Sequence, residues 1–354
     1  MSNSFGFGGN NAVLIFSQPE SAPLTRPIQT KPVAVAGIGL IGPGVDANRQ
    51  VEPPLPAGTV WVHDCGSLAG AESLNPNQRR RLNRMAQMSL LAARSSHSAN
   101  PSQRVAIAMG TGMGCLEDGA VFIENLISKD EREPMPARFP GSVHNAPAAQ
   151  IAIDQQARGL NSAPTIGEIS FECAVWQAMS QLWSGEADCA VAGAVDELSK
   201  YVLSIGQRWG LWTKQTRPGE GAVAVNLVLS EKAAAPLATV KAVHFGRYRR
   251  PFDANQEADW IASKFDLKSI DVVLTGVGGM PQLDAMYRQV IKKLAERAGR
   301  TLEQQTYKQL CGEFHAASGF GFSGALDLIR GGKRRVLLYT LSLRGGKAIT
   351  LVQK

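Results

Sequence analysis

Short runs of hydrophobic residues recur along the chain from Val33 onward, and segments with helical spacing of apolar positions separate them. Runs of this kind, bounded by turn residues, predict buried β-strands. The alternation of such strands with helices predicts an α/β fold built in layers. The predicted strands cover residues 33–38, 104–109, 189–194, 222–229, 271–275, 336–341 and 348–352.

Two segments predict helices of different character. Residues 79–95 place apolar side chains on one face and arginines on the other, which predicts an amphipathic helix at the surface. Residues 168–184 are apolar on nearly every side and include Phe171, Trp176 and Trp183. Since a helix without a polar face is buried on most sides, we expect this helix to lie between two layers.

Composition narrows the class of protein. Hydrophobic residues make up 44% of the 354 residues and charged residues 19%, which is typical of a folded, soluble protein. No apolar run approaches the roughly 18 residues of a membrane-spanning helix. The first 25 residues contain no Lys or Arg and no apolar block of the signal-peptide type. We therefore expect a cytoplasmic protein without a membrane span.

Charge and cysteine content exclude further classes. The net charge of +7 is spread in short clusters without interleaved aromatic residues, so we expect no nucleic-acid binding. The five cysteines are an odd number without metal-ligand spacing, which argues against disulfides and a zinc site. The basic cluster of Arg247, Arg249 and Arg250 could meet an acidic carrier protein or be an ordinary solvated surface.

Three groups of motifs follow one another along the chain: Phe139-Pro140 with Val143-His144-Asn145-Ala146-Pro147; Gly185-Glu186-Ala187-Asp188 leading into Ala192-Gly193 and Asp196-Glu197; and Arg217-Pro218 with Gly219-Glu220-Gly221-Ala222. Together with the glycine-rich turns in 33–43 and 105–114, they resemble the β-ketoacyl-acyl-carrier-protein synthases of the thiolase-like family. The resemblance covers nearly the whole chain. It implies an α/β, five-layered αβαβα fold of two similar halves, at 33–232 and 233–354.

The resemblance also implies a reaction. Active members of the family join acyl chains by decarboxylative Claisen condensation on one cysteine and two histidines. The cysteine begins the buried helix, where the helix dipole favours the thiolate that takes up the acyl chain. The histidines donate hydrogen bonds to the malonyl thioester oxygen and stabilise the enolate that forms as carbon dioxide leaves.

All three family positions hold other residues in this chain. The length of the buried helix, counted back from the Gly-x-Ala-Asp run, places Glu168 at the cysteine position. Segment 275–281 replaces the first histidine motif and puts Gly276 at the histidine. Segment 312–319 resembles the second motif, with Glu313 at its histidine. A carboxylate at Glu313 would repel a developing enolate.

Two residues leave an alternative open. Cys173 could be the nucleophile of an active synthase, with His315 in a catalytic role. A cysteine five residues further along the helix, however, points about 140° away from the family position and lies about 7.5 Å further inward. Otherwise Cys173 is a small buried apolar residue and His315 supports or packs against its neighbours.

Three replaced positions in a retained framework predict a partner subunit. The sequence resembles the chain-length factors, inactive relatives that pair with an active synthase in polyketide and aryl-polyene systems. The resemblance implies an active ketosynthase as the partner, in a heterodimer or a fusion, and an acyl carrier protein as a further partner, with no cofactor and no metal. The cysteine position of chain-length factors holds Gln, so Glu168 departs from their pattern. A third hypothesis is a scaffold that only stabilises its partner.

The first residues raise a separate question. Residues 1–16 resemble the last strand of an active ketosynthase, although the chain has its own counterpart at 336–352. Two such endings imply an upstream ketosynthase, joined through the Pro-rich linker at 17–32 or encoded by an overlapping gene. The alternative is a genuine strand that pairs with the edge of this protein's own sheet.

Overall fold

The computed structural model describes residues 2–5, 11–14, 30–43, 48–51, 60–96, 104–136, 138–213 and 215–354. The strands are β1 (Ser2–Phe5), β2 (Asn11–Leu14), β3 (Val33–Ile41), β4 (Asn48–Val51), β5 (Val60–His63), β6 (Val105–Gly110), β7 (Asn161–Ser162), β8 (Cys189–Asp196), β9 (Gly221–Leu229), β10 (Ala238–Arg247), β11 (Val272–Thr275), β12 (Glu303–Thr306), β13 (Arg335–Leu341) and β14 (Gly346–Gln353). The α-helices are α1 (Pro76–Arg81), α2 (Arg84–Ser96), α3 (Leu116–Ser128), α4 (Phe139–Ser142), α5 (Ala146–Asp154), α6 (Ser170–Trp183), α7 (Lys200–Arg208), α8 (Ala254–Ala262), α9 (Pro281–Ala298), α10 (Lys308–Cys311) and α11 (Ser318–Arg330). Short 3-10 helices are η1 (Ala71–Ser73), η2 (Gly167–Ile169), η3 (Ser230–Lys232), η4 (Leu267–Ser269) and η5 (His315–Ala317).

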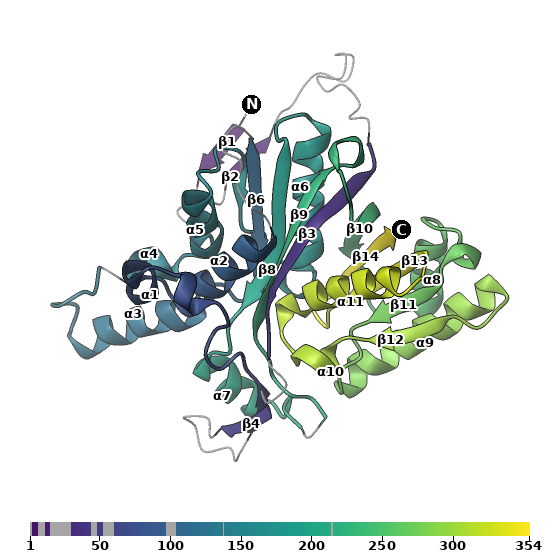
Figure 1. The fold of residues 1–354 in the computed structure, drawn as a ribbon. Helices are drawn as coiled ribbons and strands as arrows, with labels where there is room; N and C mark the ends of the chain where they lie inside the picture. Colours follow the sequence, from purple (N-terminus) through teal and green to yellow (C-terminus); the bar gives the residue numbers. More distant parts are fainter. Residues whose placement is uncertain are drawn as a thin grey trace.

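The main sheet contains the same strand order twice. From its centre outwards, β3, β9, β8, β6 and β7 run to one edge, and β10, β14, β13, β11 and β12 run to the other. The two series meet where β3 pairs antiparallel with β10, Val33 to Val35 against Val240 to Ala238. The chain therefore builds two halves of like topology that share one sheet (Figure 1).

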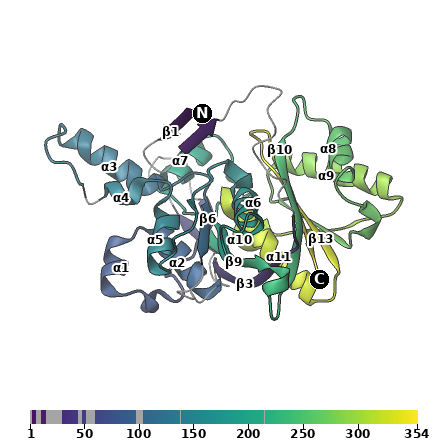
Figure 2. The same cartoon turned by 90° about the horizontal axis from the view of Figure 1, so that it is seen from above.

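Helices cover the sheet in three layers. On the outer face of the first half, α2 and α5 pack against β6, β8 and β9. Between the halves, α6 and α11 pack against strands of both. On the outer face of the second half, α8 and α9 pack against β11, β13 and β14. The result is an αβαβα arrangement, seen from two directions in Figures 1 and 2.

The side chains of the central strands explain why helices cover both faces of the sheet in each half. In β9, Ala222 and Ala224 belong to the outer cluster, whereas Val223 and Val225 face the central helices. Successive side chains of a strand point to opposite faces. A strand that is apolar at every position, as β9 is over these residues, must therefore be buried on both faces.

The seven strands predicted from the apolar runs are all present, with ends shifted by a few residues. Sequence reasoning missed β10 and β12, which are needed to complete the second half. β10 carries Lys241 and His244 among its apolar residues, and β12 is a polar edge strand of which three residues are exposed. Neither gives the continuous apolar signal by which the other strands were recognised.

The single surface helix predicted at 79–95 is wrong. The chain forms two helices there, because α1 ends at Arg81 and Asn83 accepts a hydrogen bond from the backbone of Ala86 near the start of α2. Arg79, Arg80 and Arg81 lie in α1, whereas most of α2 is buried against the sheet and its two arginines stand at positions 84 and 94. The prediction for 168–184 is confirmed: α6 is buried between the layers, although Trp176 is 42% exposed.

Two small sheets stand apart from the main one. The strands β1 and β2 pair antiparallel with each other, and β4 pairs antiparallel with β5. Residues 6–10 and 15–29, which include part of the segment resembling a last ketosynthase strand and most of the Pro-rich linker, lie outside the described residues. None of the helices in the described ranges is long and apolar enough to cross a membrane.

A buried carboxylate joins the two halves near the start of the central helices. Asp196, at the end of β8, is 3% exposed. It accepts hydrogen bonds from the hydroxyl of Thr111 (2.7 Å) and the backbone N–H of Gly112 (3.0 Å), both after β6. It also accepts one from the backbone N–H of Ala316 (2.9 Å), in η5 of the second half. We call this group the Asp196 clamp.

The substitution Asp196→Asn should destabilise the protein, because the amide would turn an N–H2 group towards backbone donors. We expect the free energy of unfolding to fall by about 2–4 kcal/mol in urea denaturation. The control is Asp259→Asn, which removes an exposed pair with Arg297 and should cost no more than about 1 kcal/mol. Equal losses in the two variants would contradict a special role for the clamp.

Candidate functional site

The candidate site lies where the two central helices begin side by side. η2 leads into α6 and η5 leads into α11, and the two turns contact each other. Glu168 belongs to η2 and His315 to η5. The turn after β6 passes directly against His315, because a Cβ atom at Gly112 would collide with the Cβ atom of His315. Only glycine fits at that position.

Glu168 and His315 form an ion pair. Glu168 Oε1 lies 3.5 Å from His315 Nδ1, and both side chains are mostly buried. Burial alone would raise the pKa of Glu168, but the hydrogen bond and the charge of His315 outweigh it and lower that pKa to about 2. Burial likewise disfavours the imidazolium of His315, yet the partnership with Glu168 raises the pKa of His315 above its ordinary value. Each charge therefore stabilises the other.

Glu313 is neutralised by a second buried cation. Its Oε1 atom pairs with Lys308 Nζ, and the two side chains are 11% and 4% exposed. The backbone of Glu313 is held by a hydrogen bond from its N–H to the carbonyl of Arg217 (2.7 Å). Burial raises the pKa of Glu313, and Lys308 opposes that rise. Sequence reasoning considered the carboxylate of Glu313 alone, whereas Lys308 lies against it.

The space beside Gly276 is already filled. A Cβ atom at this position would lie 2.8 Å from the hydroxyl of Tyr287, 2.9 Å from that of Tyr307 and 3.2 Å from Lys308 Cε. Both tyrosines are fully or almost fully buried, and the Tyr287 hydroxyl accepts a hydrogen bond from the backbone N–H of Leu341 (2.7 Å). An imidazole at position 276 would need all three side chains to move.

Cys173 lies inside α6 and does not take part in this cluster. Its residue is 5% exposed, and burial, with a smaller contribution from the neighbouring Glu172, raises the pKa of its thiol to about 11. Among the residues that the structure describes, Cys173 makes no hydrogen bond with His315. A thiol in this environment is protonated at neutral pH and is a poor nucleophile.

The structure thus groups Glu168, His315, Glu313 and Lys308 and leaves Cys173 apart. Glu172, in the first turn of α6, accepts hydrogen bonds from the hydroxyls of Thr340 (2.6 Å) and Ser318 (3.1 Å). Burial raises the pKa of Glu172 to about 7. Sequence reasoning missed Lys308, Glu172 and the two tyrosines. The spacing of Lys308, one short helix before Glu313, was the only signal that could have indicated the pair.

Comparison with known proteins relates this chain to the ketoacyl synthases. Residues 66–230 match the family model of the β-ketoacyl synthase N-terminal domain. A 3-oxoacyl-[acyl-carrier-protein] synthase 2 of Staphylococcus aureus is 23% identical, over 48% of this chain and 46% of its own length. The chain spans about half the length of the curated relatives it matches.

Solved structures resemble the whole fold. The ishigamide ketosynthase/chain length factor aligns with a TM-score of 0.74 and 16% identity, over 91% of this chain and 99% of its own. The type II PKS ketosynthase AntDE in complex with its acyl-carrier protein AntF aligns with a TM-score of 0.77 and 14% sequence identity, over 92% of this chain and 100% of its own. A β-ketoacyl synthase from Burkholderia phymatum aligns with a TM-score of 0.77 and 13% sequence identity, over 92% of this chain and 99% of its own. The chain has the fold of the thiolase-like ketosynthases, and its residues 66–230 resemble the N-terminal domain of the β-ketoacyl synthases.

The substitution Glu168→Gln should lower the pKa of His315, as measured by NMR titration with His315→Gln used for assignment. The pair stabilises the fold above the ordinary carboxyl pKa of 4.5 and below the ordinary imidazole pKa of 6.5. This stabilisation is lost as pH falls towards about 2, where Glu168 is protonated, and as pH rises through the raised pKa of His315.

The control for this titration is Glu186→Gln, which changes an exposed carboxylate before β8. It should leave the pKa of His315 unchanged. If Glu168→Gln also leaves that pKa unchanged, the ion pair does not exist in solution.

Proposed function

We propose that this chain is a non-catalytic ketosynthase-like subunit of the chain-length-factor type, which pairs with an active ketosynthase in acyl chain elongation. The observation that carries the proposal is the ion pair of Glu168 with His315 at the start of α6, the position at which the family's thiol nucleophile is expected. A glutamate at this position carries no thiol, so it cannot form the acyl thioester on which condensation depends.

The remaining groups support the same proposal. Stabilising an enolate requires donors that point at the substrate oxygen and are free to bind it. Lys308 is instead engaged by Glu313, and the space at Gly276 is taken by two tyrosine hydroxyls. Lys308 is therefore held by Glu313, and position 276 offers no imidazole donor to a substrate.

The exposed surface of α3, α4 and α7 supports the pairing. Among the thirteen residues of α3 only Asp118 is buried, and Figures 1 and 2 show α3 and α4 projecting from the body of the molecule. A hydrogen bond from Tyr201 to Glu124 joins α7 to α3. Exposed apolar side chains on these helices are Ile123 (56%), Ile127 (73%), Phe139 (46%) and Ile205 (44%), and Trp209 (70%) follows directly after α7.

Apolar side chains gathered on projecting helices are typical of a protein–protein interface. We infer that the active ketosynthase covers this surface, and that an acyl carrier protein delivers the substrates to the pair. Relatives described as a ketosynthase/chain length factor and as a ketosynthase with its acyl-carrier protein are consistent with such an assembly. A cytoplasmic location remains a prediction.

The first test is acylation of the isolated protein. After incubation with acyl-loaded carrier protein, intact-mass measurement should find no stable adduct on the wild type and no difference in Cys173→Ala, because the buried thiol stays protonated. Acylation of the wild type that disappears in Cys173→Ala would establish the alternative, an active synthase using Cys173 and His315. The single change Glu168→Cys should still not permit condensation, since both histidine positions lack donors.

The second test concerns pairing. Ile127→Asp should weaken the 1:1 complex with a co-expressed active ketosynthase at least about tenfold, roughly 1.4 kcal/mol, because it places a charge in the apolar surface. The matched control is Leu310→Asp in α10, where the side chain is equally exposed at 77% but lies in the other half. Dissociation constants from sedimentation or calorimetry decide the matter, and equal effects of the two variants would count against this surface.

A further inference from the structure

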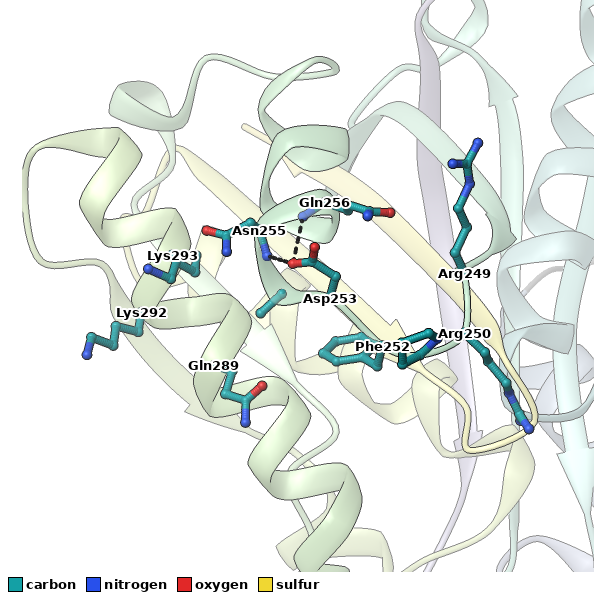
Figure 3. A pocket seen from close by; sticks show the side chains of 11 residues that line it. Arg249, Arg250, Phe252, Asp253, Asn255, Gln256, Gln289, Lys292 and Lys293 are labelled. Carbon is teal, nitrogen blue, oxygen red and sulfur yellow. Dashed lines mark hydrogen bonds between the residues drawn. The ribbon is translucent and has the colours of Figure 1, made fainter.

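A hollow on the outer face of the second half is lined by no residue of the candidate site, although its Gln289 lies two residues after Tyr287 in α9. Its volume is about 670 Å³, and it is lined by the segment before α8, the first turn of α8 and one face of α9. Figure 3 shows Phe252 at its wall, with the amides of Asn255 and Gln289 beside it. Hollows of this size can take a side chain or a ligand group of another molecule.

Four cations surround the hollow. Arg249 and Arg250 come from the segment before α8, and Lys292 and Lys293 come from α9. In the described part of the chain, the side chains of Arg249 and Lys292 make no hydrogen bond or ion pair, whereas Arg250 donates to the carbonyl of Leu343 and Lys293 to Glu296. Two positive charges at the rim are thus available to a partner.

The one acidic residue at the hollow does not cancel this charge fully. Asp253 uses its carboxylate to cap α8, accepting hydrogen bonds from the backbone N–H of Asn255 (2.7 Å) and Gln256 (3.4 Å). The wider surroundings are also basic. Residues 233–354 contain 19 Lys and Arg against 10 Asp and Glu, although the whole chain has 37 against 30. The positive net charge of the protein therefore resides in the second half.

The directions of the cations indicate what they fit. In Figure 3 Arg249 and Arg250 stand at one end of the hollow and extend away from it in opposite directions, and Lys292 and Lys293 lie across from them on α9. Cations that diverge around a rim cannot converge on one phosphate group. They suit carboxylates spread over a protein surface, with an apolar side chain of the partner entering beside Phe252.

We propose that this hollow is a docking site for an acidic segment of a partner protein. The proposal does not depend on the function proposed above, because it uses no residue of the candidate site or of the α3, α4 and α7 surface. A nucleic acid is the less suitable occupant, since the cations form two separate pairs and not the continuous stripe that tracks a phosphate backbone.

The test measures binding of a fluorescent Glu-rich amphipathic peptide to the isolated full-length protein by anisotropy, at low and at physiological ionic strength. Arg249→Glu with Lys292→Glu should weaken binding about tenfold, and salt should weaken wild-type binding as well. The control, Arg79→Glu with Arg81→Glu, makes the same change of charge on exposed residues of α1 and should leave binding within about twofold.

Each result decides for or against the site. If the double reversal lowers the melting temperature, Arg249→Gln with Lys292→Gln replaces it and should give a smaller loss of affinity in the same direction. Equal losses in the two pairs of variants would mean that the peptide only senses net charge, and the proposal would be wrong. Tighter binding of a DNA duplex of equal charge, abolished by the Arg249 and Lys292 changes, would reassign the site to nucleic acid.

Discussion

The geometry of the candidate site depends on the Asp196 clamp. Backbone and side-chain donors from the turn after β6 and from η5 converge on one carboxylate, and only an acceptor with two oxygens can satisfy them together. Ala316 follows His315 directly, so the bond that holds its N–H also sets the place of His315 beside Glu168. The clamp thereby ties the start of α11 in the second half to the ends of β6 and β8 in the first half.

The candidate site buries several charged side chains close together, and such charges are stable only when each has a partner of opposite charge. Taking a carboxylate or an ammonium group out of water costs several kcal/mol, and a partner at ion-pair distance offsets that cost. Glu168 with His315, and Glu313 with Lys308, meet this requirement within the chain. A catalytic centre instead keeps donors oriented for charge that develops on a substrate.

How far the fold could be predicted depended on burial. β9 and β13 were recognised because strands covered on both faces are apolar at consecutive positions. β12 was missed because its exposed residues at the sheet edge carry no such pattern. The break between α1 and α2 was missed because it results from Asn83, whose capping bond does not alter the apolar spacing. At the site, motif spacing indicated Glu168 and Glu313 but not the cations that neutralise them.

The sequence by itself determined that this chain builds alternating buried strands and helices, and that no thiol stands at position 168. The first follows from the spacing of apolar residues along the chain, and the second from the residue type at a single position. Only the tertiary structure decided which charges meet. Glu168 and His315 are far apart in the chain, and their distance depends on how η2 and η5 pack and on the room left by Gly112. Contacts of this kind follow from packing between layers, which no local pattern of residues encodes.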